Sequence, residues 1–223
     1  MSDIFREIDE DLRRDQAADL WKKYGSWFLA FAVVLVGATA AYRAYLHFEA
    51  QKAEALGARY QAALELSRAG KSADAAKEFS AIASEGTAGY QVLARFRAAA
   101  ELQASDKAAS AGQFDALAND AGVGPVLQGL ARLRAATILA DTLSSTELAQ
   151  RLEPLLAQGS SWAPNARELL GLSALKAGDL ANAGKQFDAI MTDPATPPAL
   201  RQRTELYLAL VKSGTAASAA PAQ

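Results

Sequence analysis

The chain has 223 residues, with 23 lysines and arginines against 25 aspartates and glutamates and a formal net charge of −2. This length is enough for one domain of ordinary size and some additional segments. A chain with nearly equal numbers of acidic and basic residues is a poor candidate for a nucleic-acid-binding protein. With no cysteine and one histidine, a disulfide framework, thiol catalysis and the common zinc sites are excluded.

Residues 1–23 form a short amphipathic arm in this prediction. Apolar side chains recur at intervals of three and four residues, with charged residues between them, as on one face of a helix. The arm carries seven acidic and five basic side chains, whereas helices that lie on membranes prefer a basic polar face. A cytoplasmic partner protein is therefore at least as good an explanation of the apolar face as the membrane surface. A merely solvated arm is the third interpretation.

The 19 residues from Tyr24 to Tyr42 include no charged side chain. At about 1.5 Å per helical residue they reach roughly 28 Å, close to the ~30 Å hydrocarbon core of a bilayer. Basic and aromatic side chains flank the stretch at both ends, as interfacial anchors do. We therefore predict a transmembrane helix over residues 24–45, with membrane lipid as a partner. The flanking residues are Trp21, Lys22, Lys23 and Trp27 on one side and Tyr42, Arg43 and Tyr45 on the other.

Two other interpretations of this stretch stay open. A buried helix of a soluble core is disfavoured by the length of the run without charges. A cleavable signal peptide is supported by Ala38-Thr39-Ala40, which has the small-x-small form of a cleavage site. The net acidic segment of 23 residues before the run is, however, unlike a short basic leader.

Lysine and arginine set the orientation of a span. Five of them precede the apolar run, whereas only Arg43, Lys52 and Arg59 follow it within about 20 residues. The arm should therefore remain in the cytoplasm, and the chain after residue 45 should lie on the other side of a single-pass membrane protein.

The remaining sequence predicts an all-α fold, because it is rich in alanine and contains few prolines. No helix breaker occurs between Arg43 and Gly57, so helix is expected to continue from the span to Arg68. Beyond it, short breaks separate helices of roughly 12–18 residues. The breaks are at 69–71, 105–106, 122–125, 144–145, 159–161, 177–179 and 194–198, and the expected N-caps are Ser72, Asp106, Ser145, Ser161 and Asp179.

Four repeats follow one another with a period close to 34 residues. Each has a large apolar residue, a second apolar residue three positions later, and a small residue sixteen positions earlier. AGKSADAAKEFSAI at 69–82 also matches AGDLANAGKQFDAI at 177–190. The large residues are Phe79, Phe114, Leu152 and Phe187, the second set is Ile82, Leu117, Leu155 and Ile190, and the small residues are Ala63, Ala98, Ala136 and Gly171.

This pattern resembles the tetratricopeptide repeat, most closely in the fourth unit, where Leu170-Gly171, Ala183 and Phe187 occupy its characteristic positions. The early tryptophan is missing from every unit, and the third connection has three extra residues, so the stack should be irregular there. We predict a tetratricopeptide-like α-solenoid of about four helical hairpins over residues 46–212, closed by a capping helix over 198–212. An ordinary antiparallel helical bundle is the alternative. The uncharged tail, residues 213–223, is predicted to be disordered.

The sequence indicates a protein that is not an enzyme and has no metal or cofactor. His47 follows the span, where an interfacial side chain is expected, and Gly122-x-Gly124 precedes Pro125 as in a turn. Repeat stacks instead present a concave surface to an extended peptide or a helix. The candidate partner-binding residues on that surface are Tyr60, Gln61, Arg68, Arg95, Phe96, Leu133, Arg134, Asn165, Glu168 and Leu169.

An acidic arm that ends in Trp21-Lys22-Lys23-Tyr24-Gly25, followed by one span and degenerate repeats, resembles the bacterial ancillary SecYEG translocon subunit family. The resemblance implies a bacterial inner-membrane protein with its repeats in the periplasm. It implies as partners the Sec channel subunits, a periplasmic prolyl-isomerase-like chaperone and exported client proteins. The function expected from it is an adaptor that assists export or folding of periplasmic proteins, with no catalytic residues.

Two alternatives belong to other functional classes. The same anchor and repeats would suit a scaffold for cell-envelope or cell-division machinery. Cleavage after Ala40 would instead release a soluble periplasmic binding module.

Overall fold

The computed structural model describes residues 2–219, and every regular element in that range is a helix, which confirms the all-α prediction. The chain divides into two compact units, one up to Ala55 and one from Leu56 onward, whereas the repeat domain was predicted to start at residue 46. The helices are α1 (Ser2–Arg68), α2 (Ser72–Glu85), α3 (Ala88–Leu102), α4 (Lys107–Ala118), η1 (Ala121–Val123), α5 (Pro125–Leu139), α6 (Ser145–Leu152), η2 (Glu153–Leu156), α7 (Ala163–Lys176), α8 (Leu180–Thr192) and α9 (Pro198–Ala219).

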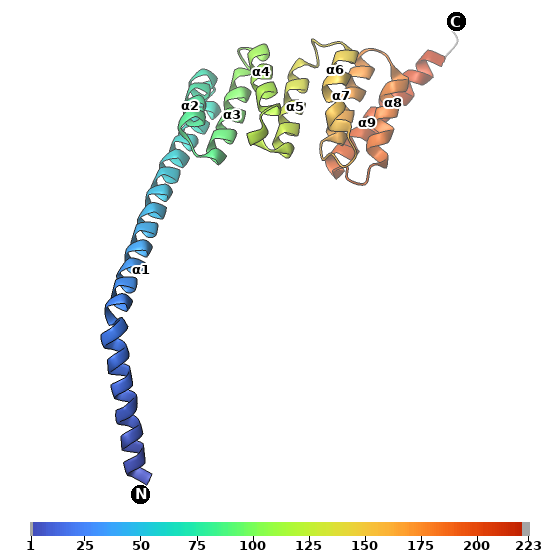
Figure 1. Ribbon diagram of the computed structural model, residues 1–223. Coiled ribbons are helices and arrows are strands. Elements are labelled where there is room, and N and C mark those ends of the chain that lie inside the picture. Colours follow the sequence, from blue (N-terminus) through green and yellow to red (C-terminus); the bar gives the residue numbers. More distant parts are fainter. Residues whose placement is uncertain (1, 220–223) are drawn as a thin grey trace. The chain divides into compact units, whose positions relative to one another are not determined.

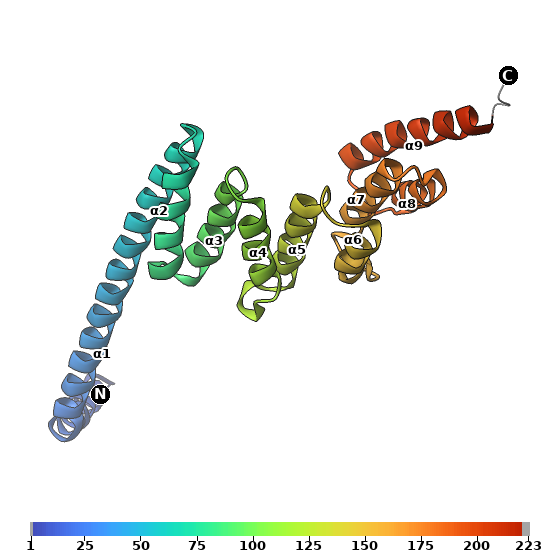
Figure 2. The same cartoon turned by 90° about the horizontal axis from the view of Figure 1, so that it is seen from above.

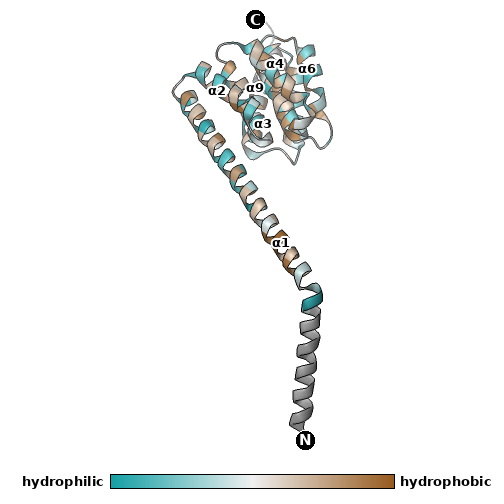
Figure 3. Ribbon diagram, turned by 60° about the vertical axis from the view of Figure 1, so that its left-hand side comes forward, coloured by the Kyte–Doolittle hydropathy of each residue, from teal (hydrophilic) through white to brown (hydrophobic). Residues whose placement is uncertain are grey.

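The first unit is the part of α1 before Leu56. Between Trp21 and Arg68, α1 is long and apolar enough to cross a membrane. Figure 3 shows its apolar stretch in brown. The most apolar part of this helix is not buried in protein, and Trp27 and Val34 are 78% and 67% exposed, unlike the residues of a soluble core helix. A signal sequence near the N-terminus has the same length and composition as such an anchor.

The second unit is a series of helical hairpins that begins with the last turns of α1 (Figures 1 and 2). The end of α1 shares a core with α2, and each later helix packs against the next, most closely α2 with α3, α4 with α5 and α7 with α8; α9 closes the series. Four small cores of buried side chains lie along it, and each is built from helices that follow one another in the chain. This arrangement is the predicted solenoid of four hairpins with a capping helix.

The large apolar residue of each repeat is the centre of one core. Phe79, Phe114, Leu152 and Phe187 are all buried, and so are the four apolar residues that follow them by three positions. The small residues at the helix crossings are also buried, because a larger side chain there would keep the two helices apart. The repeat register predicted from the spacing is therefore the packing register of the structure.

The predicted breaks all coincide with helix ends, and the two matching segments make the same turn. Gly70 and Gly178 both have a left-handed backbone, with φ of 74° and 76°, which glycine adopts without strain. One break was missed, because Gly86 and Thr87 separate α2 from α3. This connection has only two residues and no proline, so the sequence gives only a weak indication that a helix ends there.

Two of the five predicted N-caps are confirmed, since the carboxylates of Asp106 and Asp179 accept hydrogen bonds from the backbone N–H groups of Ala109 and Asn182. The other three predictions were wrong by one residue: Lys71, Ser144 and Trp162 occupy the N-cap positions of α2, α6 and α7. At α6 the pair of serines left the choice ambiguous, and Glu147 decides it by closing a capping box with Ser144.

The three extra residues from which irregularity was predicted lie between Phe114 and Ala136, where the 3₁₀ helix η1 joins α4 to α5. A second irregularity, within the third repeat, was not predicted. α6 has only 8 residues and gives way to the 3₁₀ helix η2, which contains Pro154. Proline lacks a backbone N–H and its ring collides with the preceding turn, so α6 cannot continue through it. Leu155 is buried nonetheless, because the 3₁₀ turn keeps it on the side of the core.

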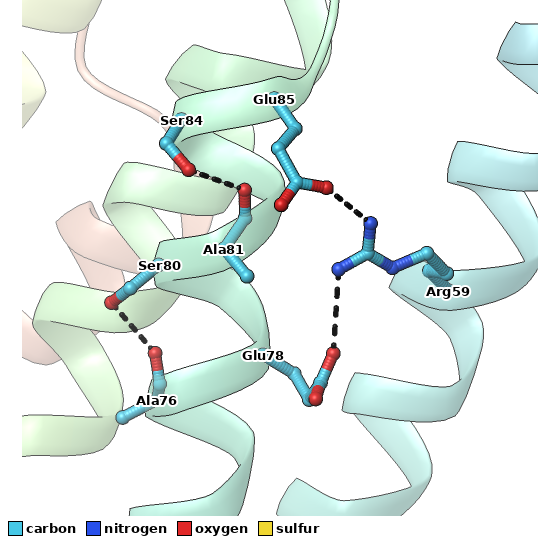
Figure 4. Close-up of polar contacts among 7 residues, drawn as sticks. All are labelled: Arg59, Ala76, Glu78, Ser80, Ala81, Ser84 and Glu85. Atoms are coloured by element: carbon cyan, nitrogen blue, oxygen red, sulfur yellow. Dashed lines mark hydrogen bonds and ion pairs between the residues drawn. The ribbon is translucent and has the colours of Figure 1, made fainter.

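Polar contacts join consecutive helices and also join successive repeats. Figure 4 shows Arg59 of α1 bridging Glu78 and Glu85 of α2, at 3.7 Å and 2.6 Å. Contacts at separations of 34 to 36 residues link each repeat to the next: Ser67 to Glu101, Asp115 to Arg151, Asp141 to Lys176 and Glu168 to Arg203. Most of these groups are substantially exposed, so each pair contributes little energy. Their repeated spacing specifies how neighbouring hairpins align.

The closing helix is longer than predicted. α9 continues to Ala219, past the expected end at residue 212, and so includes the first residues of the segment predicted to be disordered. Alanine and serine at these positions are compatible with helix, and no proline occurs between Pro198 and Pro221. Residues 220–223 of that segment lie outside the described residues.

Gly171→Ala should destabilise the second unit. A Cβ atom at this position would lie 2.4 Å from Cε1 of Phe187, whose ring is fully buried. We expect a loss of about 1–3 kcal/mol, measured as a thermal midpoint several degrees lower by circular dichroism. Gly112→Ala in α4 is the matched control: a Cβ there meets nothing within 4 Å, so it should stabilise by about 0.5–1 kcal/mol. Equal effects of both changes would contradict the predicted crossing.

Acid should weaken the start of α6 through Glu147. Its carboxylate accepts hydrogen bonds from the Ser144 hydroxyl at 2.7 Å and the Ser144 backbone N–H at 2.9 Å, which lowers the pKa of Glu147 below the ordinary value of about 4.3. Because the folded pKa is the lower one, this stabilisation is present above the unfolded pKa. It is lost as the pH falls from about 4 through the folded pKa.

Glu147→Gln keeps the capping box but removes the titration. We expect a thermal midpoint close to that of the unmodified protein at about pH 7, and a smaller drop between about pH 7 and about pH 3. Melting curves of both proteins across this range measure the difference. If the thermal midpoints of the unmodified protein and of Glu147→Gln fell by the same amount, the Glu147 carboxylate would not contribute to the acid sensitivity.

Candidate protein-interaction surface

A groove of about 390 Å³ lies between α5 and α7. Five of the ten predicted partner-binding residues line it, together with four that were not predicted. Four of its nine lining residues are half-buried leucines, and four polar or charged side chains lie between them. The predicted lining residues are Leu133, Arg134, Asn165, Glu168 and Leu169, and the others are Leu130, Thr137, Trp162 and Leu172.

The two walls of the groove are equivalent faces of two helices. On α5 the lining residues are 130, 133, 134 and 137, and on α7 they are 165, 168, 169 and 172, so each wall follows the spacing of one helix face. Each residue of one wall is 35 positions from its counterpart in the other, which is the repeat period. The groove is thus the space between equivalent faces of two successive first helices.

Arg134 supplies a positive charge in the groove that no other described side chain neutralises. It is exposed and forms no ion pair or hydrogen bond with the side chains that the structure describes. The nearby Glu168 is neutralised, because its two carboxylate oxygens accept hydrogen bonds from Nε and Nη2 of Arg203, both at 3.1 Å. These bonds raise the pKa of Arg203 above its usual value. The net result is an apolar groove with one cation available.

Trp162 closes one end of the groove. Its indole N–H donates a 2.9 Å hydrogen bond to the Val126 carbonyl oxygen. The ring lies against Gly129 so closely that a Cβ atom there would be 2.4 Å from Cδ1 of the indole. The absence of a side chain on Gly129 therefore positions this aromatic group.

The other five predicted residues do not join the groove. Tyr60 and Phe96 are packing residues, with their rings 5.2 Å and 5.8 Å from those of Phe79 and Phe114. Arg95 forms a 2.5 Å ion pair with Asp120, which lowers the pKa of that carboxyl group. It lines a separate hollow of about 220 Å³ bordered by α2, α3 and α4. Gln61 and Arg68 are exposed, and Arg68 pairs with Glu65 at 2.5 Å.

The missed groove residues carried a signal in the sequence. Leu130 and Thr137 lie one turn either side of the predicted pair Leu133-Arg134, and Leu172 lies one turn after Leu169. Extending each predicted face by a turn would have found them. Trp162 had no such signal, because it lies in the irregular connection before α7, outside the repeat pattern.

The groove is suited to binding rather than to chemistry. Leucine and tryptophan side chains can bury apolar groups of a partner, and Asn165, Thr137 and Arg134 can hydrogen-bond its polar groups. Two parallel rows of such residues fit an extended peptide or a helix better than a small compact ligand.

Comparison with known proteins gives one family. The model of a tetratricopeptide repeat-like domain family matches residues 19–212. No curated protein and no solved structure gives a significant match to the chain.

Proposed function

Because the chain belongs to the tetratricopeptide repeat-like domain family, we propose that it is a membrane-anchored, non-enzymatic protein-interaction scaffold that holds partner segments in the groove between α5 and α7. The observation that carries the proposal is the groove itself. It combines apolar walls, an available cation and a spacing set by the repeat period. Domains of this repeat type generally act by binding other proteins.

The partners that we propose are the Sec channel subunits, a periplasmic prolyl-isomerase-like chaperone and exported clients. Support comes from the order of segments: an acidic amphipathic arm ending at Lys23, then one apolar stretch, then the repeats. In this proposal the span of α1 lies in a bacterial inner membrane, the arm is cytoplasmic and the repeats are periplasmic. The excess of lysine and arginine before the span supports that orientation.

Cross-linking in intact cells tests the partner assignment. A photoreactive residue at Leu169 in the groove should capture Sec channel subunits, the chaperone or an exported client, identified by mass spectrometry after purification in mild detergent. The same residue at the exposed Lys185 on α8 is the control and should capture far less. Recovery of cell-division or cell-wall proteins without the channel would instead favour a scaffold for envelope machinery. The mass of the purified chain would reveal any cleavage after Ala40.

Charge reversal at Arg134 tests the groove. We expect Arg134→Glu to reduce partner capture roughly tenfold if a partner carboxylate contacts this cation, since placing like charges together costs at least about 1.4 kcal/mol. Helicity and the thermal midpoint should not change, because Arg134 is exposed and has no ion-pair partner among the described residues. Capture is measured by the same cross-linking experiment.

Lys185→Glu is the matched control, since it makes the same change of charge away from the groove. Arg95→Glu is a poorer probe, because it would place a second carboxylate beside Asp120. Undiminished capture by Arg134→Glu would mean that partners bind elsewhere on the repeats.

A further inference from the structure

An apolar stripe lies on the outer face of α9. Leu206 and Leu210 are one turn apart and are 68% and 59% exposed, and the exposed Ala209 lies between them on the same face. Terminal helices of repeat stacks usually have a polar outer face, which keeps the stack soluble. This closing helix therefore lacks the surface expected of a simple cap.

The stripe differs from other exposed apolar residues of the second unit. The two further large hydrophobic side chains exposed among its described residues are Leu93 on α3 and Val126 on α5, and single residues of this kind are common on protein surfaces. On α9 two leucines and an alanine follow the spacing of one helix face. The cluster is what requires an explanation.

The opposite face of α9 is tightly packed, which fixes the direction of the stripe. Leu200, Thr204 and Val211 are buried, and the ring of Tyr207 lies 5.2 Å from that of Phe187. These contacts join α9 to α7 and α8, and Figure 2 shows α9 lying along them at the end of the series. The helix cannot rotate to bury Leu206 and Leu210 without exposing these residues.

We propose that this stripe is a self-association surface, on which α9 of a second copy packs in the antiparallel direction. A two-fold axis near residue 208 would place Leu206 of each copy against Leu210 of the other, with the small Ala209 near the axis, where helices approach closely. Such an interface must be self-complementary, because both copies contribute the same patch. The stripe meets this condition, because its two leucines can pack against the same two leucines of the second copy.

The charges beside the stripe select the antiparallel direction. Glu205 and Lys212 are exposed and seven residues apart, so they lie on the same flank of the helix, within about 20° of each other. In an antiparallel pair, this flank of one helix faces the same flank of the other helix. Glu205 of each copy then meets Lys212 of the other. In a parallel pair this flank would instead face the opposite flank of the partner helix, so Glu205 of one copy would not meet Lys212 of the other. Glu205 forms no ion pair with any side chain that the structure describes.

The association should be weak and dependent on concentration. α9 has 22 residues, so one pair of such helices buries less than the ~1,200 Å² at which stable interfaces begin. Copies held in the same membrane are concentrated by that confinement, so a weak contact suffices there.

The chain contains no cysteine, so a single introduced thiol reports the contact directly. Ala209→Cys in the full-length protein, purified in mild detergent and mildly oxidised over a series of protein concentrations, should form a disulfide-linked dimer. Ala181→Cys places a thiol on another exposed alanine, on α8, as the matched control. We expect the dimer of Ala209→Cys to form at least tenfold faster than that of the control. Equal rates would overturn the proposal, and so would cross-linking of Ala209→Cys in cells to other proteins but never to itself.

A charge-swap cycle tests the direction of the pair. In the Ala209→Cys background, Glu205→Lys should slow dimer formation roughly three- to tenfold, because two exposed ion pairs become two repulsive contacts. Lys212→Glu should do the same, and the double variant Glu205→Lys with Lys212→Glu should restore the rate. A double variant as slow as the single ones would overturn the antiparallel arrangement. Circular dichroism of each variant confirms that α9 is folded.

Discussion

The structure depends on burying one large apolar side chain in the second helix of each repeat, and in three of the four repeats this side chain shares its core or its contact with the small residue of the preceding helix. Phe187 against Gly171 is the closest example, since the glycine has no room for even one more carbon atom. Burial of an aromatic side chain contributes a few kcal/mol, and the close approach of the two helices adds dispersion contacts.

Because every core is built from neighbouring helices, stability is distributed along the second unit and is not concentrated in one centre. Four cores with separate members follow one another from the end of α1 to α9. In such a stack each hairpin is stabilised by itself and by its neighbours. Exposed ion pairs between repeats add alignment more than energy. The end helix has a neighbour on one side only, which is why the outer face of α9 is significant.

The same packing also creates the surfaces that bind. The inner faces of α5 and α7 bring equivalent positions side by side, and the residues there need not fill a core, so they can differ between repeats. Leucine, asparagine, arginine and glutamate occupy matching places in the two walls. Arg134 is available to a partner, whereas Arg203 satisfies Glu168. The groove and the α9 stripe are separate surfaces, and the apolar stretch of α1 belongs to the other unit.

The sequence by itself determined the features that depend on periodicity and composition. The apolar stretch of α1, the all-α class, the four repeats, the irregular connection before α5 and the positions of the four large apolar residues all follow from local patterns. Those residues are Phe79, Phe114, Leu152 and Phe187. Helix period, turn chemistry and the need to bury large apolar residues act within a few tens of residues.

Only the tertiary structure decided which surface residues come together. Tyr60 and Phe96 share the helical register of the groove residues, yet neighbouring helices cover them, and Arg95 is taken by Asp120. Trp162 reaches the groove from an irregular loop whose path no period describes. Leu206 and Leu210 are exposed because α9 is the last helix of the series and no further helix covers its outer face. In each case the outcome is set by contacts between segments that are distant in sequence, and a local pattern does not specify those contacts.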